Sequence, residues 1–168
     1  MRILKHEFVQ LYSDEYKFLL LHAIKCYFFE PTFAACVNIR RMQQTKPRIR
    51  KILYRNMIMK KYGIEISPDA KIGRKFSIMH IGNIVIGAGT IIGNGCKIYQ
   101  GVTIGCKNDE YPVIGDNVTI FPGAKVIGGI KIGNNVVIGT NAVVLHDVAS
   151  NCVVAGNPAR VIKRNGVQ

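Results

Sequence analysis

An aliphatic residue returns every six positions through much of the chain, and this period constrains the fold more than any other feature. One block runs from Ile86 to Ile104 and a second from Ile114 to Val144, often with Gly after the aliphatic residue. A second row, four positions further on, is small or β-branched: Thr90, Cys96, Val102, Val118, Ala124, Ile130, Val136, Ala142 and Val148. An amphipathic helix needs a period of about 3.6 residues, so the pattern excludes one.

The six-residue period predicts stacked coils of β-strand. Short strands of β-branched residues alternate with turns in which Gly or Asn tolerates positive φ, so the chain winds and its inward side chains stack from coil to coil. A single six-residue unit cannot bury its apolar side alone, and neighbouring coils must supply the rest of the core. We therefore predict a mainly β fold, a parallel β-helix domain over residues 64–168 that ends in a C-terminal tail.

Residues 1–63 lack this period and show helical patterning. Helices are predicted up to about residue 12 and over residues 18–29, 32–42 and 47–62. The run at 18–29 is too short to span a bilayer. We expect it to pack against a neighbouring helix or subunit, with the alternative that it rests on the inner face of a membrane.

The net charge of +13 is concentrated in this helical N-terminal region. Residues 1–64 hold 13 Lys and Arg against four Asp and Glu. No nucleic-acid motif accompanies the charge, so phosphates, anionic lipid or an acidic substrate suit it equally well, and no nucleic-acid partner is expected. Five widely spaced cysteines without a Cys-x-x-Cys pair, and no signal-peptide pattern, predict reduced thiols and a cytoplasmic protein.

The six-residue register breaks first around residues 79–83. Ile78 closes one phase and Ile86 opens another that is shifted by two residues. His80 lies at this break and is the only His between residues 64 and 145. Because insertions in repeat proteins often carry function, and because imidazole titrates near neutrality, His80 is a candidate general base.

The second break is longer. Ten residues separate Ile104 from Ile114, which predicts an inserted loop at about residues 106–113. The repeat region holds only two histidines, His80 and His146, too few for a zinc site of the β-helix carbonic anhydrase type. We expect no metal.

Several motifs in order resemble those of the bacterial hexapeptide acyltransferases, and within them the serine acetyltransferase-like branch. They cover residues 64–164, in segments that begin at Ile66, His80, Tyr99, Gly123 and Val154. The resemblance implies a left-handed β-helix, a homotrimer with active sites between neighbouring subunits, and an enzyme that uses acetyl-CoA as donor.

By this resemblance His80 matches the catalytic base, and Glu65 aligns with the carboxylate that orients it. The resemblance also implies that acetyl-CoA lies in a groove between two β-helices. The positions that match its binding residues are Gly105, Cys106, Gly123, Ala124, Thr140, Asn141, Arg160 and Lys163.

The acceptor side departs from the serine acetyltransferase pattern. Met79 replaces an Asp before the catalytic His, and Glu110 and Tyr111 replace an Arg-His pair in the inserted loop. Serine carries an ammonium and a carboxylate group, which such polar side chains would bind. The loss of these side chains favours a neutral acceptor that contacts Met79 and Tyr111. We therefore expect O-acetylation of a sugar hydroxyl in a cell-surface polysaccharide or its precursor.

Other functions stay open at this stage. One alternative is serine O-acetylation in cysteine synthesis, and another is a non-catalytic trimeric β-helix that only binds a partner. Neither the choice between O- and N-acetylation nor the length of the acyl donor follows from the sequence.

Overall fold

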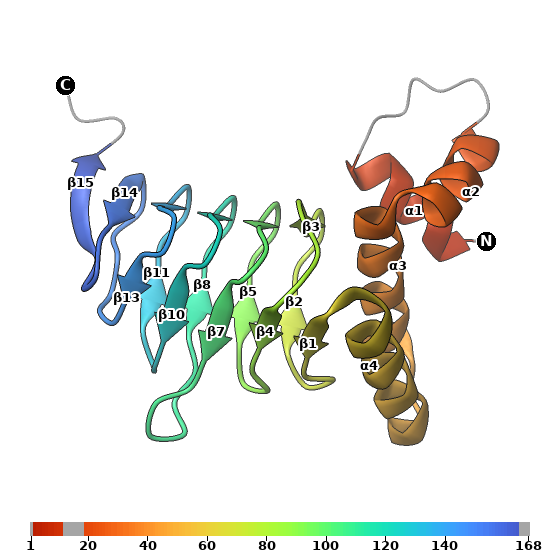
Figure 1. The fold of residues 1–168 in the computed structure, drawn as a ribbon, viewed down its shortest axis with the longest axis horizontal. Helices are drawn as coiled ribbons and strands as arrows, with labels where there is room; N and C mark the ends of the chain where they lie inside the picture. Colours follow the sequence, from red (N-terminus) through yellow and green to blue (C-terminus); the bar gives the residue numbers. More distant parts are fainter. Residues whose placement is uncertain (1, 12–18, 165–168) are drawn as a thin grey trace.

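The computed structural model describes residues 2–11 and 19–164. The repeat region forms a parallel β-helix, and helices pack against its first coil (Figure 1). The predicted β-helix with a helical N-terminal region is therefore confirmed.

Four helices precede the β-helix: α1 (Arg2–Leu11), α2 (Leu19–Phe29), α3 (Pro31–Gln44) and α4 (Arg48–Tyr62). Pro31 occupies the first turn of α3, where a missing N–H costs nothing. Gly63 ends α4 in the left-handed conformation, with φ of 63°, and its N–H donates to the carbonyl of Met59 at 3.0 Å. The chain enters the first strand directly after this cap.

Three faces make up the β-helix, and we name them by their strand number. The five-stranded face contains β1 (Ile64–Ile66), β4 (Ile84–Ile86), β7 (Thr103–Gly105), β10 (Lys125–Ile127) and β13 (Val143–Val144). The four-stranded face contains β2 (Lys71–Ile72), β5 (Ile91–Ile92), β8 (Val113–Ile114) and β11 (Lys131–Ile132). The six-stranded face contains β3 (Ser77–Ile78), β6 (Lys97–Ile98), β9 (Thr119–Ile120), β12 (Val137–Ile138), β14 (Cys152–Ala155) and β15 (Arg160–Arg164).

The six-residue period becomes three stacked columns of buried aliphatic side chains, one behind each face. The columns are Ile66, Ile86, Ile104, Val126 and Val144; Ile72, Ile92, Ile114 and Ile132; and Ile78, Ile98, Ile120, Ile138 and Val154. Each strand is so short that its burial depends on the coils above and below, which is why the period must hold over many turns.

The segment expected to be a C-terminal tail is a strand over Arg160–Arg164. This strand, β15, reverses direction and pairs antiparallel with β14, with a register irregularity at Val153 and Val154. All five of its residues are exposed, so it has no inward apolar alternation. The periodicity that predicted the coils therefore gave no signal for it.

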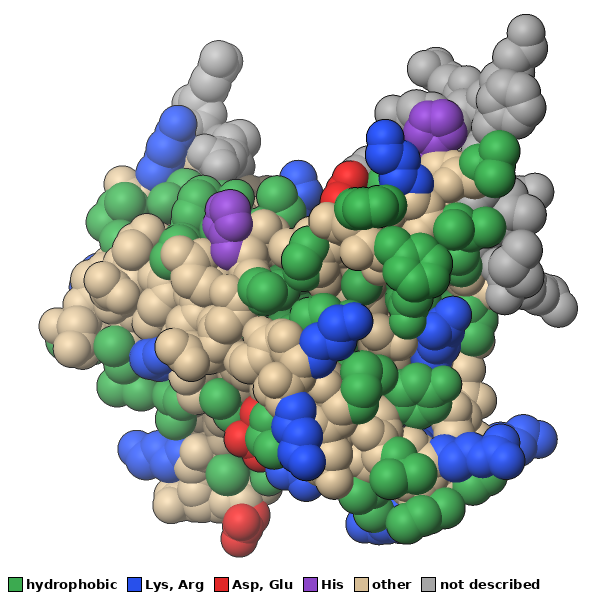
Figure 2. Space-filling view, turned by 45° about the vertical axis from the view of Figure 1, so that its right-hand side comes forward, with side chains coloured by type: hydrophobic (Ala, Val, Ile, Leu, Met, Phe, Trp, Pro, Cys, Tyr) green, Lys and Arg blue, Asp and Glu red, His purple; other side chains and the backbone are tan. Residues whose placement is uncertain are grey.

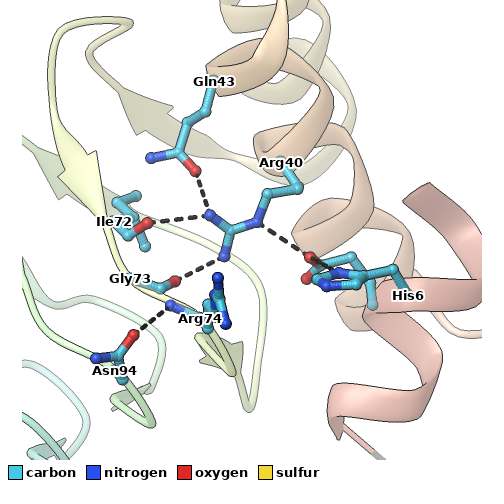
Figure 3. A network of polar contacts seen from close by, with 8 residues as sticks. His6, Arg40, Gln43, Ile72, Gly73, Arg74 and Asn94 are labelled. Atoms are coloured by element: carbon cyan, nitrogen blue, oxygen red, sulfur yellow. Dashed lines mark hydrogen bonds and ion pairs between the residues drawn. The ribbon is translucent and has the colours of Figure 1, made fainter. Parts of the chain in front are cut away.

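Helix α3 completes the open end of the β-helix. Elsewhere the N–H groups of one coil donate to carbonyls of the next, for example Gly73 to Ile92, so the first coil lacks a donor. Arg40 supplies it, with Nη1 to the Ile72 carbonyl at 3.0 Å and Nη2 to the Gly73 carbonyl (Figure 3). Its Nε pairs with the buried carboxylate of Glu7 at 3.0 Å, which ties α1 to the same junction.

Candidate active site

His80 lies in the turn at residues 79–83, where the chain passes from the six-stranded to the five-stranded face. Gly82 and Asn83 adopt positive φ, 109° and 53°, which Gly and Asn tolerate best. Met79 and His80 are exposed. The first break in the register is therefore a corner of the β-helix that presents an imidazole to solvent.

Two aromatic rings support this imidazole. Because β3, β6 and β9 pair in register, the residues that follow them line up along one corner. The ring of Tyr99 lies 5.8 Å from that of His80, centroid to centroid, at an interplanar angle of 53°. Phe121 stacks on the other side of Tyr99 at 5.1 Å and 15°. Sequence reasoning missed this column, although the register of the repeat could have revealed it.

The same corner continues along the following coils. Successive turns are joined by backbone hydrogen bonds: Gly101 N–H to Gly82 O, Gly123 N–H to Gln100 O, and Asn141 N–H to Pro122 O, each at 2.9 Å. The structure thus brings His80 to the same corner as the predicted donor residues Gly123, Ala124, Thr140 and Asn141.

Other predicted donor residues lie elsewhere. Gly105 ends β7 and Cys106 opens the inserted loop, at the opposite edge of the five-stranded face. Arg160 and Lys163 are exposed on β15, at the far end of the β-helix from the helices (Figure 1). The side chain of Ala124 is buried in the core, so this residue offers only its backbone to a surface site.

Glu65 lies on the outer side of β1, and its carboxylate pairs with Arg55 of α4 at 2.9 Å. Among the hydrogen bonds of the described residues, none joins Glu65 to His80, whose ring contacts Tyr99 instead. Both residues belong to the first coil. The orienting role of Glu65 stays a prediction.

A cavity of about 390 Å³ lies between α4 and the first two coils. Its walls carry charges of both signs together with apolar side chains: Arg48, Lys51, Ile52, Arg55, Glu65, Ser67, Pro68, Asp69, Val85, Ile86, Gly87 and Ala88. The cations escaped sequence reasoning, although three basic residues at helical spacing indicate one face of a helix.

The inserted loop joins β7 to β8 and projects from the β-helix (Figure 1). Lys107 and Glu110 form an antiparallel bridge, with N–H to carbonyl bonds of 3.1 Å in both directions. Asn108 and Asp109 between them have positive φ, 53° and 60°, as in a tight hairpin turn. The second break in the register is thus a small ordered hairpin.

Tyr111 fastens this loop to the preceding coil. Its ring lies over Gly87 and Gly89, and a Cβ at Gly87 would come within 2.7 Å of the ring. A hydrogen bond with the Cys106 thiol raises the pKa of Tyr111. Tyr111 therefore lies over the turn that follows β4, whereas Met79 lies in the turn beside His80, so the two predicted acceptor contacts occupy separate places.

Over 2–11 and 19–164, the structure contains no group of three or more His, Cys, Asp or Glu side chains placed to hold a metal ion.

Part of the repeat region matches a known protein family. Residues 111–146 match the family described as bacterial transferase hexapeptide (six repeats). This part of the repeat region is therefore similar to the hexapeptide-repeat transferases.

Two relatives that this chain resembles are serine acetyltransferases. The chain is 42% identical to the serine acetyltransferase of Synechococcus elongatus, over 88% of this chain and 62% of that protein. It is 50% identical to the serine acetyltransferase of Staphylococcus aureus strain Mu50, over 63% of this chain and 52% of that protein. The chain therefore spans between half and two thirds of the length of these relatives.

Solved structures of serine acetyltransferases also superpose on this chain. The serine acetyltransferase of Brucella abortus strain S19 superposes with a TM-score of 0.82 and 26% identity, covering 98% of this chain and 69% of that one. The soybean serine acetyltransferase apoenzyme superposes with a TM-score of 0.77 and 32% identity, covering 83% and 61%.

These relatives overturn the sugar acceptor expected from the sequence. That expectation was wrong because it counted charges only at Met79, Glu110 and Tyr111. The cavity beside Glu65 contains further charges, which come from helix α4, outside the motifs of the repeat region. The loss of polar groups at these three positions therefore did not show how much charge a bound ligand would meet.

Proposed function

We propose that this chain is a serine O-acetyltransferase that moves the acetyl group of acetyl-CoA to the hydroxyl of serine. The observation that carries the proposal is the 42% identity with the Synechococcus protein, because the match extends over 88% of the chain and so beyond the repeats. The superposition on the serine acetyltransferase of Brucella abortus supports the same substrate, because it covers 98% of this chain and so includes the helices as well as the β-helix.

His80 acts as the general base in this proposal. Its imidazole takes the proton of the serine hydroxyl while the oxygen attacks the thioester carbonyl, and it returns the proton to the departing CoA sulfur. The exposure of His80 at a corner, and its support by Tyr99, suit a residue that must meet two substrates.

The donor lies along the corner that carries His80. Turns at Gly123 and Asn141 offer a surface of small residues and backbone groups on which a narrow pantetheine arm can lie. Arg160 and Lys163 on β15 provide positive charge for the phosphates of CoA. In this proposal the thioester lies toward the first coil and the nucleotide toward the C-terminal coils.

The direct test incubates the full chain with acetyl-CoA and L-serine and measures acetylserine by mass spectrometry. We expect wild-type product, with the acetyl group on oxygen, and a loss of about 10²- to 10⁴-fold in kcat for His80→Ala. The His80→Ala variant should keep the wild-type thermal unfolding midpoint, because the side chain is exposed. Absence of acetylserine from the wild-type chain, or near-normal turnover of the variant, contradicts the proposal.

We also propose that the chain forms homotrimers through the faces of the β-helix. Outward positions on the strands are apolar and exposed at Val85, Ile91 and Val113, with 37%, 39% and 41% of their surface accessible. Burial of such residues between subunits would be favourable. Light scattering after gel filtration should give three times the chain mass of 18.7 kDa, and a monomer mass contradicts trimer formation.

Membrane contact is a separate proposal, which concerns α2. Phe28 and Phe29 are exposed, and Figure 2 shows hydrophobic side chains interspersed with Lys and Arg over the helical part of the molecule. Within the described residues, no helix combines the length and apolarity needed to cross a membrane. Sedimentation with anionic vesicles should pellet the protein and neutral vesicles should not; protein that stays in the supernatant with both rejects the contact.

A further inference from the structure

One face of α4 carries three cations toward the first coil. Arg48, Lys51 and Arg55 follow each other at spacings of three and four residues, so they share one side of the helix. All three line the cavity of about 390 Å³, whose opposite wall contains the carboxylates of Glu65 and Asp69. The cavity therefore has a basic wall on the helix and an acidic wall on the β-helix.

The ion pair that joins these walls is accessible. Arg55 Nη2 lies 2.9 Å from Glu65 Oε1, and the two side chains are 36% and 47% exposed. Exposed ion pairs contribute little to stability, so a ligand can separate this one at small cost. A ligand with both an anionic and a cationic group would restore a partner to each residue without changing the net charge of the cavity.

The composition of the walls selects the ligand. The two carboxylates beside the cations disfavour a polyphosphate, because they would repel its negative charges. A small zwitterion matches both walls, and the side chains of Ile52 and Val85 add apolar surface between them. The volume suits a small molecule.

We infer that this cavity binds an α-amino acid, with its carboxylate on Arg55 and its ammonium group on Glu65. The inference rests on the proposed function, since serine is then the amino acid that enters. The cavity lies on the face into which the turn of His80 leads, because β1, which carries Glu65, pairs with β4, the strand that follows this turn. Helix α4 thereby supplies the cation that Glu110 and Tyr111 do not provide.

Arg55→Gln tests the inference, with Arg50→Gln as the matched control. Arg50 lies on the same helix but lines a separate apolar groove with Leu53, Tyr54 and Met57. We expect Arg55→Gln to raise KM for serine by roughly tenfold or more, because a charged hydrogen bond is lost. KM for acetyl-CoA should stay unchanged, Arg55→Lys should restore part of the serine affinity, and Arg50→Gln should behave as wild type.

Calorimetric titration separates this inference from the proposed function. Wild-type protein should bind L-serine and L-alanine, which share both charged groups, and should not bind ethanolamine, which lacks the carboxylate. Arg55→Gln should lose both amino acids. Serine binding by Arg55→Gln at wild-type affinity, or no binding of either amino acid by the wild type, overturns the inference. Binding without acetyl transfer leaves the cavity assigned and rejects only the reaction.

Discussion

The imidazole of His80 rests against the ring of Tyr99, with 5.8 Å between centroids and 53° between planes. Phe121 backs Tyr99 at 5.1 Å, so three rings follow one another along a corner of the β-helix. Aromatic contacts of this kind contribute beyond their buried area. The direction in which His80 presents its nitrogens therefore depends on a neighbour one coil away.

Tyr99→Leu removes this support and should lower kcat for acetyl transfer by roughly two- to tenfold, with little change in either KM. The reason is geometric, since the base stays in place but samples more orientations. Tyr99→Phe keeps the ring and should retain most of the activity. Steady-state kinetics of the two variants decide the point, and equal activity of Tyr99→Leu and wild type would show that the contact does not orient His80.

Arg40→Met should lower the free energy of unfolding by about 3 kcal/mol, because the buried Glu7 carboxylate loses its permanently charged partner and keeps only the His6 imidazole at 3.6 Å. It also removes the donors to the carbonyls of Ile72 and Gly73. Urea unfolding followed by circular dichroism measures the loss.

The double variant Arg40→Met, Glu7→Leu serves as the control for that experiment. Removing both members of a buried pair avoids the unpaired charge, so this variant should recover a large part of the lost stability. A double variant as unstable as Arg40→Met would instead assign the loss to the carbonyls at the end of the β-helix.

The repeating part of the fold could be predicted because each coil obeys the same local rule. Ile92, Ile114 and Ile132 all lie in one buried column, as the six-residue spacing requires. β15 escaped because a strand paired at an edge, with every residue exposed, has no inward pattern to detect. The six-residue period predicts which side chains are buried, and it cannot predict a strand whose side chains are all exposed.

The candidate site was predictable only in part, for a similar reason. His80 stands out because it interrupts the register, and the structure puts it at an exposed corner. The pairing of Glu65 with Arg55 joins a strand to a helix ten residues earlier, and no repeat rule relates the two. Contacts between the helical region and the β-helix depend on how α4 packs, which the sequence pattern of neither part specifies.

Thr90→Val should stabilise the protein. The Thr90 side chain is fully buried, and its hydroxyl is the one buried side-chain polar atom without a hydrogen-bond partner among the described residues. Valine has nearly the same shape and no polar group, so the exchange should add about 1 kcal/mol to the free energy of unfolding. An increase of about 2–4 °C in Tm is the corresponding result by calorimetry.

Thr103→Val is the matched control. The Thr103 hydroxyl accepts a hydrogen bond from Lys125 Nζ at 3.1 Å, so its removal should leave Tm unchanged or lower. Equal stabilisation by both exchanges would point to β-propensity rather than to the unpaired hydroxyl of Thr90.

Two buried cysteines make the free energy of unfolding depend on pH in the alkaline range. Burial raises the pKa of the Cys36 thiol to about 12 and that of the Cys96 thiol to about 11, from an ordinary value of 9.0. Above pH 9 the unfolded chain loses these protons while the folded chain keeps them. The contribution to stability is therefore complete below pH 9 and is lost as the pH rises toward 11 and 12.

Urea unfolding at pH 8 and pH 10.5 should show this loss, and the double variant Cys36→Ala, Cys96→Ala should lose less stability between the two pH values. Other groups titrate in the same range, so the difference between the two proteins isolates the thiols. At pH 8 a thiol reagent should label the exposed Cys106 first, and Cys36 and Cys96 only after unfolding, because the thiolate is the reactive form. An identical pH dependence in both proteins, or rapid labelling of Cys36 or Cys96 in the folded state, contradicts the assigned burial.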